Sequence, residues 1–143
     1  MQKVVIDTNV FVSSLIQQSY PYRIVNELFI EERIALCISE SLILEYYEVL
    51  RQPKFSVFYD FSAKADALLA DIAIKSIMYV PKIKLEILSD KDDNMVLELA
   101  DACSADYVIT GNTKDFTFPA CKSTKIVTPK DYRLFYQPYP PDI

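Results

Sequence analysis

Short apolar runs alternate along this chain with longer segments whose apolar residues recur at helical spacing. The runs predict β-strands, and the spacing predicts helices between them. The expected strands cover residues 2–6, 33–38, 76–80, 105–110 and 125–128. The expected helices cover residues 9–17, 22–32, 39–51, 63–75 and 92–104, with a last helix from Pro129 and an aromatic-rich loop at 54–61. The expected N-caps of the third, fourth and fifth helices are Ser39, Ser62 and Asp92 or a neighbour.

This alternation favours an α/β fold. Strands that are joined by helices pair in parallel, and the helices then cover both faces of the sheet. We therefore expect a three-layer α/β/α sandwich with a mainly parallel sheet. The chain has 143 residues, close to the size of one domain. We expect a single domain over residues 1–136 and a Pro/Tyr-rich C-terminal tail at 137–143.

Composition indicates a folded protein of the cytoplasm. Apolar residues make up 51% of the chain and charged residues 24%, which favours a sizeable core over disorder. No apolar run approaches the roughly 18 residues that span a bilayer. No basic segment precedes an apolar one, as it does in a secretion signal. Because the cysteines are odd in number and lack CxxC spacing, we expect reduced thiols at Cys37, Cys103 and Cys121.

Two residue types that many enzymes need are scarce. The chain has no histidine, which excludes Ser-His-Asp and Cys-His catalysis and the usual zinc sites. It has one glycine, Gly111, which excludes the Gly-rich loops that bind nucleotide phosphates. Carboxylate chemistry with hard metal ions is what remains. The formal net charge of −5 argues mildly against nucleic-acid binding, although bound divalent cations would reverse the local sign.

Asp7 is the first candidate for such a site, because it directly follows the apolar run at 4–6. In open α/β sheets, ligands bind at the carboxyl ends of the strands. A simpler role for Asp7 is the N-cap of the first helix, with Asn9 as the rival cap. Glu45 is the second candidate: its helix begins at the end of the second strand, so Glu45 lies about 4–5 Å nearer that edge than Glu48. A solvated helix face is an equally good explanation of Glu45.

Two further acids come from later connections. Asp93 is the last of three acids within four residues, and it shares a helix face with Leu97. Acids at a helix N-terminus are favoured by the helix dipole, so a structural role also explains them. Asp115 follows the strand at 105–110, in a turn whose composition is ordinary for turns. Together, four carboxylates at one edge would repel one another without cations, and oxygen-only ligands select Mg²⁺ or Mn²⁺.

The chain resembles the PIN-domain nucleases, and more narrowly the toxin components of bacterial toxin–antitoxin systems. The resemblance covers residues 2–128 through four segments, VVIDTNV at 4–10, SESLILEYYEVL at 39–50, DNMVLELA at 93–100 and VITGNTKDF at 108–116. It implies a Mg²⁺- or Mn²⁺-dependent ribonuclease, often a homodimer. Its catalytic and metal-binding residues would be Asp7, Glu45, Asp93 and Asp115. Many members have Asp where this chain has Asn112, so Asp115 is expected to supply the fourth charge.

We therefore expect hydrolysis of single-stranded RNA, with an antitoxin protein as the partner and no membrane association. Supporting roles are expected for Thr8, Asn9, Thr110 and Asn112. Some of the ten Tyr and eight Phe rings are candidate platforms for bases, although most such rings pack in a core. The candidate phosphate contacts are Arg51, Lys54, Lys82, Lys84 and Lys114, although solvated surface is the simpler role for any one of them. Two alternatives stay open: a DNA or structure-specific nuclease on the same site, and a non-catalytic nucleic-acid-binding or scaffold protein with a degraded site.

Overall fold

The computed structural model describes residues 1–84, 91–113 and 123–136, apart from the side chains of residues 91 and 92. These residues form five strands, β1 (Lys3–Ile6), β2 (Ala35–Ile38), β3 (Ile77–Met78), β4 (Tyr107–Ile109) and β5 (Lys125–Val127). The strands build one sheet in the order β3-β2-β1-β4-β5, and every pairing is parallel. The expected parallel sheet is therefore confirmed, with β1 at its centre.

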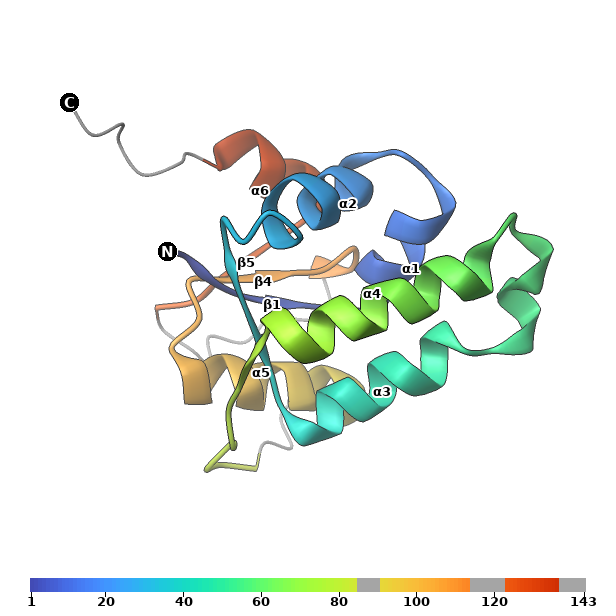
Figure 1. The fold of residues 1–143 in the computed structure, drawn as a ribbon. Coiled ribbons are helices and arrows are strands. Elements are labelled where there is room, and N and C mark those ends of the chain that lie inside the picture. Colours follow the sequence, from blue (N-terminus) through green and yellow to red (C-terminus); the bar gives the residue numbers. More distant parts are fainter. Residues whose placement is uncertain (85–90, 114–122, 137–143) are drawn as a thin grey trace.

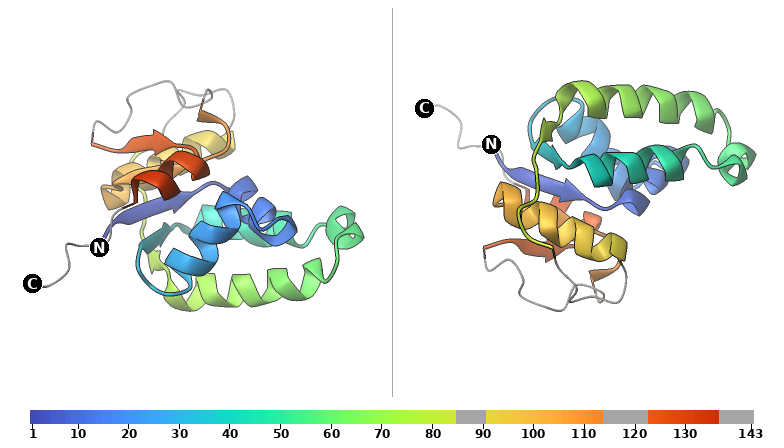
Figure 2. Two further views of the ribbon diagram at one scale, coloured as in Figure 1. Left: turned by 90° about the horizontal axis from the view of Figure 1, so that it is seen from above. Right: turned by 90° about the horizontal axis from the view of Figure 1, so that it is seen from below.

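Helices cover both faces of this sheet. Seen from above in Figure 2, α2 (Tyr20–Arg23) and α6 (Pro129–Phe135) lie over one face, and α5 (Lys91–Cys103) crosses the opposite face. α1 (Thr8–Ile16) follows β1 directly, while α3 (Glu40–Leu50) and α4 (Phe61–Lys75) form an antiparallel pair (Figure 1). This arrangement confirms the three-layer α/β/α sandwich. Within the described part of the chain, no helix is long and apolar enough to cross a membrane.

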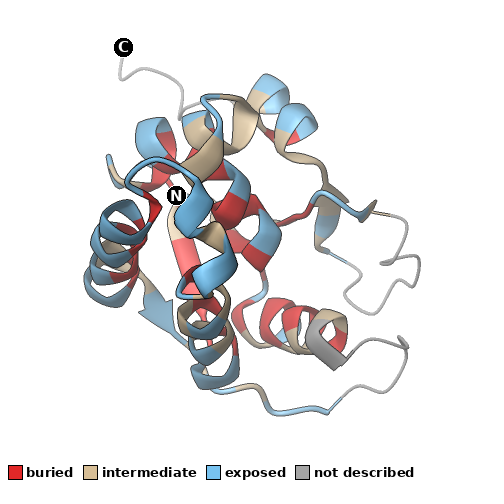
Figure 3. Ribbon diagram, turned by 90° about the vertical axis from the view of Figure 1, so that its right-hand side faces the viewer, coloured by how far each residue is buried: buried red, intermediate tan, exposed pale blue. Residues whose placement is uncertain are grey.

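The centre of the sheet is also the centre of the core. Val4, Val5 and Ile6 of β1 are completely buried, as expected of a parallel strand that is covered on both faces. Figure 3 shows that the buried positions follow the strands and the inward sides of the helices. Cys37 and Cys103 lie in this core as free thiols, as expected, and Cys121 lies outside the described residues.

The segment expected as one helix over 22–32 forms two shorter helices. α2 ends at Arg23, and a π-helix, η1 (Ile24–Phe29), follows it. The wider π-turn is marked by a hydrogen bond of 2.9 Å from the Ile30 N–H to the Val25 carbonyl, five residues earlier. This turn buries four apolar side chains together, those of Ile24, Val25, Leu28 and Phe29. The packing of these side chains overrides the regular helical pitch that the sequence pattern predicted.

The expected N-cap of α3 is confirmed, whereas α5 begins before Asp92, its expected cap. The Ser39 hydroxyl accepts a hydrogen bond of 3.2 Å from the Leu42 N–H, so Ser39 is the N-cap of α3. α5 begins at Lys91, which places Asp92 inside the helix instead of at its cap. The residue before Lys91 lies outside the described residues.

The expected N-cap of α4, Ser62, is wrong. The helix already begins at Phe61, and Asp60 precedes it in the left-handed conformation with φ 55°. Asp is one of the few residues with a side chain that adopts this conformation readily. Phe61 is buried and stacks on Phe55, with ring centroids 4.9 Å apart. Burial of the Phe61 ring therefore fixes the helix start one residue before the predicted cap. Phe55 itself belongs to a 3₁₀ helix, η2 (Pro53–Val57), within the segment expected as a loop.

Tyr132 holds α6 against the sheet. Its ring is 1% exposed and packs edge-on against Tyr107 of β4, with centroids 5.1 Å apart. Its hydroxyl donates a hydrogen bond of 2.7 Å to Oε1 of Gln2. Burial raises the pKa of Tyr132 above its ordinary value, and the neighbouring Tyr136 and Tyr107 add to the effect. The folded protein therefore favours the neutral phenol.

Substituting Tyr132→Phe should lower the free energy of unfolding by about 1 kcal/mol at neutral pH, because it removes this hydrogen bond. The pKa of Tyr132 is higher in the folded than in the unfolded state. Its contribution to stability is thus complete below about pH 10 and is lost as the pH rises further. In urea titrations, the difference in the free energy of unfolding between wild type and variant should become smaller above about pH 10. Tyr59→Phe, at a position that is 89% exposed, is the control at neutral pH; a gap that widens with pH would contradict the prediction.

Candidate active site

Asp7 and Thr110 leave two neighbouring strands side by side. Ile6 of β1 lies opposite Ile109 of β4, and the Asp7 N–H donates a hydrogen bond of 2.9 Å to the Ile109 carbonyl. The Thr110 hydroxyl donates a hydrogen bond of 2.8 Å to Oδ2 of Asp7. Thr110 is completely buried and Asp7 is half-buried. The carboxylate is thus fixed at the carboxyl edge of the sheet, between β1 and β4.

Asp7 occupies the N-cap position of α1 without acting as a cap. Its backbone is extended, at φ −65° and ψ 144°, which suits a cap. Its side chain makes no capping hydrogen bond to the helix within the described residues. The simpler role considered for Asp7 from the sequence therefore does not describe its side chain, which bonds to Thr110 instead.

Glu45 meets the start of α1 from the middle of α3. The Thr8 hydroxyl, which is buried, donates a hydrogen bond of 2.5 Å to Oε2 of Glu45. Glu45 is half-buried, whereas Glu48, one turn further along the same helix, is exposed. The structure thus brings Glu45 towards Asp7 and leaves Glu48 on the solvated side. Two neighbouring residues, Asp7 and Thr8, now tie the end of β1 to both β4 and α3.

Tyr46 is a structural member of this site that the sequence reasoning missed. Its ring is completely buried and packs edge-on against Phe11 of α1, with centroids 5.0 Å apart. Its hydroxyl donates a hydrogen bond of 2.5 Å to the carbonyl of Ile6, the residue before Asp7. Burial raises the pKa of Tyr46 well above its ordinary value, and the charges of Asp7 and Glu45 add to the effect. The Tyr46 hydroxyl therefore fixes α3 to β1, and the negative charges of both carboxylates disfavour its ionisation.

A signal for Tyr46 was present in the sequence. Leu42 and Leu50 lie four residues before and after it, so the three side chains share one helix face. All three are buried. The spacing predicts burial of the ring, but the partner of its hydroxyl depends on β1, a strand 40 residues away.

The remaining predicted site residues come from elements other than those that hold the pair Asp7 and Glu45, or from the ends of these elements. Asp93 lies in the first turn of α5, half-buried, on the helix that packs against β1 and α3. Asn9 is exposed on α1. Asn112 is also exposed, and its backbone N–H donates a hydrogen bond of 3.1 Å to the Thr110 hydroxyl. Asp115 lies outside the described residues.

The donors of this edge fit a hard divalent cation. Asp7 and Glu45 offer carboxylate oxygens, which Mg²⁺ and Mn²⁺ prefer, and the chain has no histidine to select zinc. The described residues hold no group of three or more Asp, Glu or Cys side chains that could enclose a metal ion. Mg²⁺ is usually bound through one or two carboxylates and keeps several waters, instead of sitting in an all-protein cage. A pair of carboxylates on an open edge therefore suits Mg²⁺ better than a buried structural metal.

Three comparisons with known proteins bear on this architecture. The family model described as PIN domain matches residues 3–114. An uncharacterized protein of Methanocaldococcus jannaschii, MJ1680, is 32% identical over 111 residues, which cover 77% of this chain and 70% of that protein. A chain in the crystal structure of VapBC2 from Rickettsia felis bound to a DNA fragment from their promoter is similar with a TM-score of 0.60 and 16% identity. The similarity covers 89% of this chain and 98% of that chain.

The fold and the two carboxylates at the edge of the sheet define a class of protein: an α/β domain with acidic side chains near the carboxyl ends of its parallel strands. Within that class, the chain belongs to the PIN domain family, since the family match spans most of its length. The match includes Asp7, Glu45 and Asp93 and ends one residue before Asp115. The 16% identity to the solved chain limits that likeness to the fold.

Thr110→Val should lower the free energy of unfolding by about 1–3 kcal/mol in metal-free buffer, because it removes the hydroxyl that donates to Asp7 and accepts from Asn112. Thr110→Ser keeps the hydroxyl and should recover part of that loss. Urea denaturation of the two variants and the wild type measures both effects. Equal losses in the two variants would show that the methyl group, and not the hydrogen bonds, matters at this position.

Proposed function

We propose that this PIN domain is a Mg²⁺- or Mn²⁺-dependent endoribonuclease that hydrolyses single-stranded RNA. Membership of the family supports a nuclease, since PIN domains generally have that activity. The observation that carries the proposal is the pair Asp7 and Glu45, held at the carboxyl edge of the sheet by the hydroxyls of Thr110 and Thr8. A pair of carboxylates leaves coordination positions open for water and a substrate phosphate.

The chemistry divides between a divalent ion and the protein. When bound, the ion would polarise the phosphodiester and lower the pKa of a bound water. The residues of the chain supply position: Thr110 and Thr8 restrict the two carboxylates, and Tyr46 holds α3 against β1. Ligands whose orientation is already fixed by hydrogen bonds hold the reacting groups with less loss of freedom.

Two acids complete the proposed ligand set. Asp93 is supported by its half-buried position in the first turn of α5, the helix against β1 and α3. Asp115 is proposed as the fourth acid, which holds a second ion or orients a water. The exposed Asn9 and Asn112 are proposed to contact the sugar or phosphate of the substrate.

We extend the proposal to a toxin of a toxin–antitoxin pair. The support is the fold shared with a chain of the VapBC2 structure, together with the family membership. In this proposal the protein acts on cytoplasmic RNA as a homodimer, and an antitoxin protein restrains it.

Metal binding and cleavage should respond together. At a Mn²⁺ concentration about a hundred times the Kd, the melting temperature of the wild type should rise by about 5–10 °C by mass action. The protein should then cleave a labelled single-stranded RNA, and Asp7→Asn should reduce the rate by about a hundredfold or more. Glu48→Gln, on the exposed side of α3, should behave as the wild type does.

The outcomes separate the proposal from its rivals. Equal cleavage of matched DNA and RNA would replace the ribonuclease by a less selective nuclease. If Mn²⁺ and Mg²⁺ neither raise the melting temperature nor support RNA cleavage, the chain is a binding or scaffold protein. The nuclease proposal would then be wrong.

Without metal, the two carboxylates should weaken the fold. Glu45→Gln removes one charge near Asp7 and keeps a carbonyl oxygen for the Thr8 hydroxyl, so it should raise the melting temperature in EDTA by about 2–4 °C, corresponding to about 1 kcal/mol. The same substitution at Glu48, which is exposed, should leave it unchanged. Scanning calorimetry of the three proteins measures the difference. A lower melting temperature for Glu45→Gln would mean that the carboxylate stabilises the fold, which argues against a metal site.

A further inference from the structure

The connection between α3 and α4 forms a separate projection. We call residues 51–64 the tip: they run from the end of α3 through η2 to the first turn of α4. In Figure 1 the tip is the part of the molecule that extends furthest to the right, beyond the sheet. In the right-hand view of Figure 2 it lies past the arrowhead of β1, on the side where the strand ends at Ile6, the residue before Asp7. The tip and the candidate active site therefore lie at the same end of the molecule.

The tip exposes aromatic rings although its base is well packed. Phe61 is 3% exposed and stacks on Phe55, which anchors the segment. Tyr59 is 89% exposed, and Phe58 is 38% exposed with its ring centroid 6.4 Å from that of Phe61. Figure 3, which views the molecule from the side of the tip, shows this end of the molecule as largely exposed. An aromatic ring that is ordered but uncovered is available to stack against another flat group.

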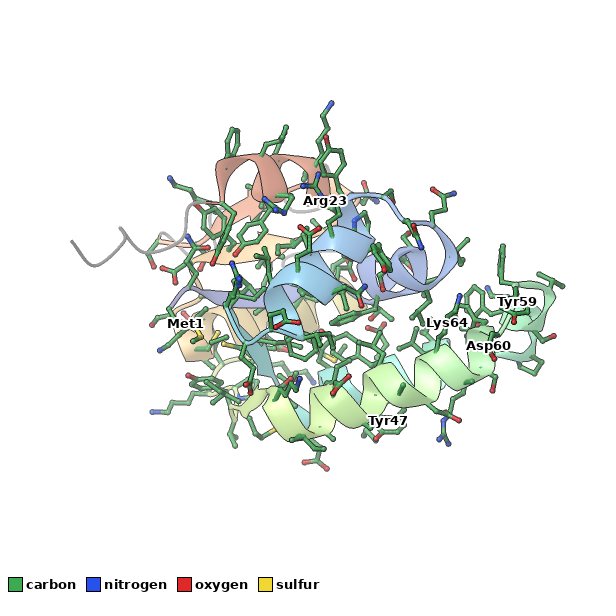
Figure 4. All side chains as sticks on the ribbon, turned by 45° about the horizontal axis from the view of Figure 1, so that its top comes forward. Met1, Arg23, Tyr47, Tyr59, Asp60 and Lys64 are labelled. Carbon is green, nitrogen blue, oxygen red and sulfur yellow. The ribbon has the colours of Figure 1, made fainter. Side chains whose placement is uncertain are left out.

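Cations accompany these rings. The Lys64 ammonium lies 5.8 Å from the centroid of the Tyr59 ring, and the two side chains lie together at the tip in Figure 4. The Lys54 ammonium lies 5.2 Å from the centroid of Phe55. Neither lysine forms an ion pair with any residue that the structure describes, whereas Arg51 pairs with Asp66 at 3.3 Å. Lys54 and Lys64 are thus available to contact a ligand.

The distance to the candidate active site suits a polymer. Arg51, where the tip begins, follows Glu45 by six residues, which corresponds to about 9 Å along a helix. A strand of nucleic acid with one phosphate at Asp7 and Glu45 would reach the tip within a few nucleotides. Apart from Arg51, which pairs with Asp66, the tip carries two cations, Lys54 and Lys64, and one acid, Asp60, in a chain whose net charge is −5. The net positive charge of the tip therefore complements a polyanion.

We propose that the tip is a subsite for single-stranded RNA, with a base stacked on Tyr59 and phosphates held by Lys54 and Lys64. Many proteins bind single-stranded nucleic acid without sequence specificity in this way: bases stack on aromatic rings, and neighbouring cations bind the phosphates. As a substrate subsite it rests on the proposed ribonuclease function, but binding itself does not require metal or cleavage. A second copy of this chain fits less well, because a symmetric contact would bring the same lysines together.

Binding without cleavage tests the ring. Fluorescence anisotropy of a short labelled single-stranded RNA in EDTA gives the Kd, and Tyr59→Ala should weaken binding by about fivefold or more. Tyr59→Phe keeps the ring and should bind as the wild type does. Phe135→Ala removes a ring that is 64% exposed on α6, away from the tip, and should have no effect. The same RNA annealed to its complement hides its base faces, so Tyr59→Ala should not change its binding.

Salt dependence tests the lysines. Replacing Lys54 and Lys64 together by Ala should lower the slope of log K against log salt concentration by about 1.4, since each phosphate contact on a single strand contributes about 0.7. The matched control replaces Lys125 and Lys130, which are exposed on β5 and α6, and should leave the slope unchanged.

Failure of the subsite and failure of the ribonuclease are distinguishable. Wild-type affinity in Tyr59→Ala and an unchanged slope in the double lysine variant overturn the subsite, even if the enzyme cleaves RNA. Tip-dependent binding by a protein that cleaves nothing supports the subsite and overturns only the catalytic proposal. If Tyr59→Ala instead disrupts an oligomer in analytical ultracentrifugation and leaves RNA affinity unchanged, the tip is a protein contact and the proposal is wrong.

Discussion

The register between β1 and β4 is the constraint on which the rest of the site depends. Ile6 and Ile109 lie opposite each other, so Asp7 and Thr110 emerge side by side at the carboxyl edge. A slip by one residue would move the acid to the other side of the sheet. The complete burial of β1 on both faces specifies this register, because any shift would expose apolar side chains or bury the carboxylate. Burial of the apolar residues of β1 thus determines the position of the Asp7 carboxylate.

Hydroxyl groups orient the two acids of the candidate site. Asp7 and Glu45 each receive a hydrogen bond from a threonine hydroxyl, and a hydroxyl orients a carboxylate without neutralising it. In the proposed function, the charge of these carboxylates attracts a divalent ion. Lys54 and Lys64 lie at the tip, at the same end of the molecule. In the proposed function, this separation leaves the acids for the metal ion and the two lysines for the substrate backbone.

Local errors in the sequence prediction have one common cause. The π-helix η1 and the early start of α4 at Phe61 both arise because large apolar side chains are drawn into the core. Helical spacing and capping preferences contain no information about the partner surface, so they set such details only within a residue or a turn. The order of strands and helices was predicted, because hydrophobic periodicity follows directly from which faces are covered.

The sequence by itself determined the α/β class, the position of Asp7 at the end of a strand, and the restriction to carboxylate chemistry, since composition and periodicity are properties of the chain alone. Only the tertiary structure decided which groups meet. The bond between Tyr46 and Ile6 joins residues 40 apart, and that between Thr110 and Asp7 joins residues 103 apart. Contacts of this range depend on strand register and helix packing, which many neighbours fix together. For that reason Asp7 is a strand-end acid in the sequence and a hydrogen-bonded partner of Thr110 only in the fold.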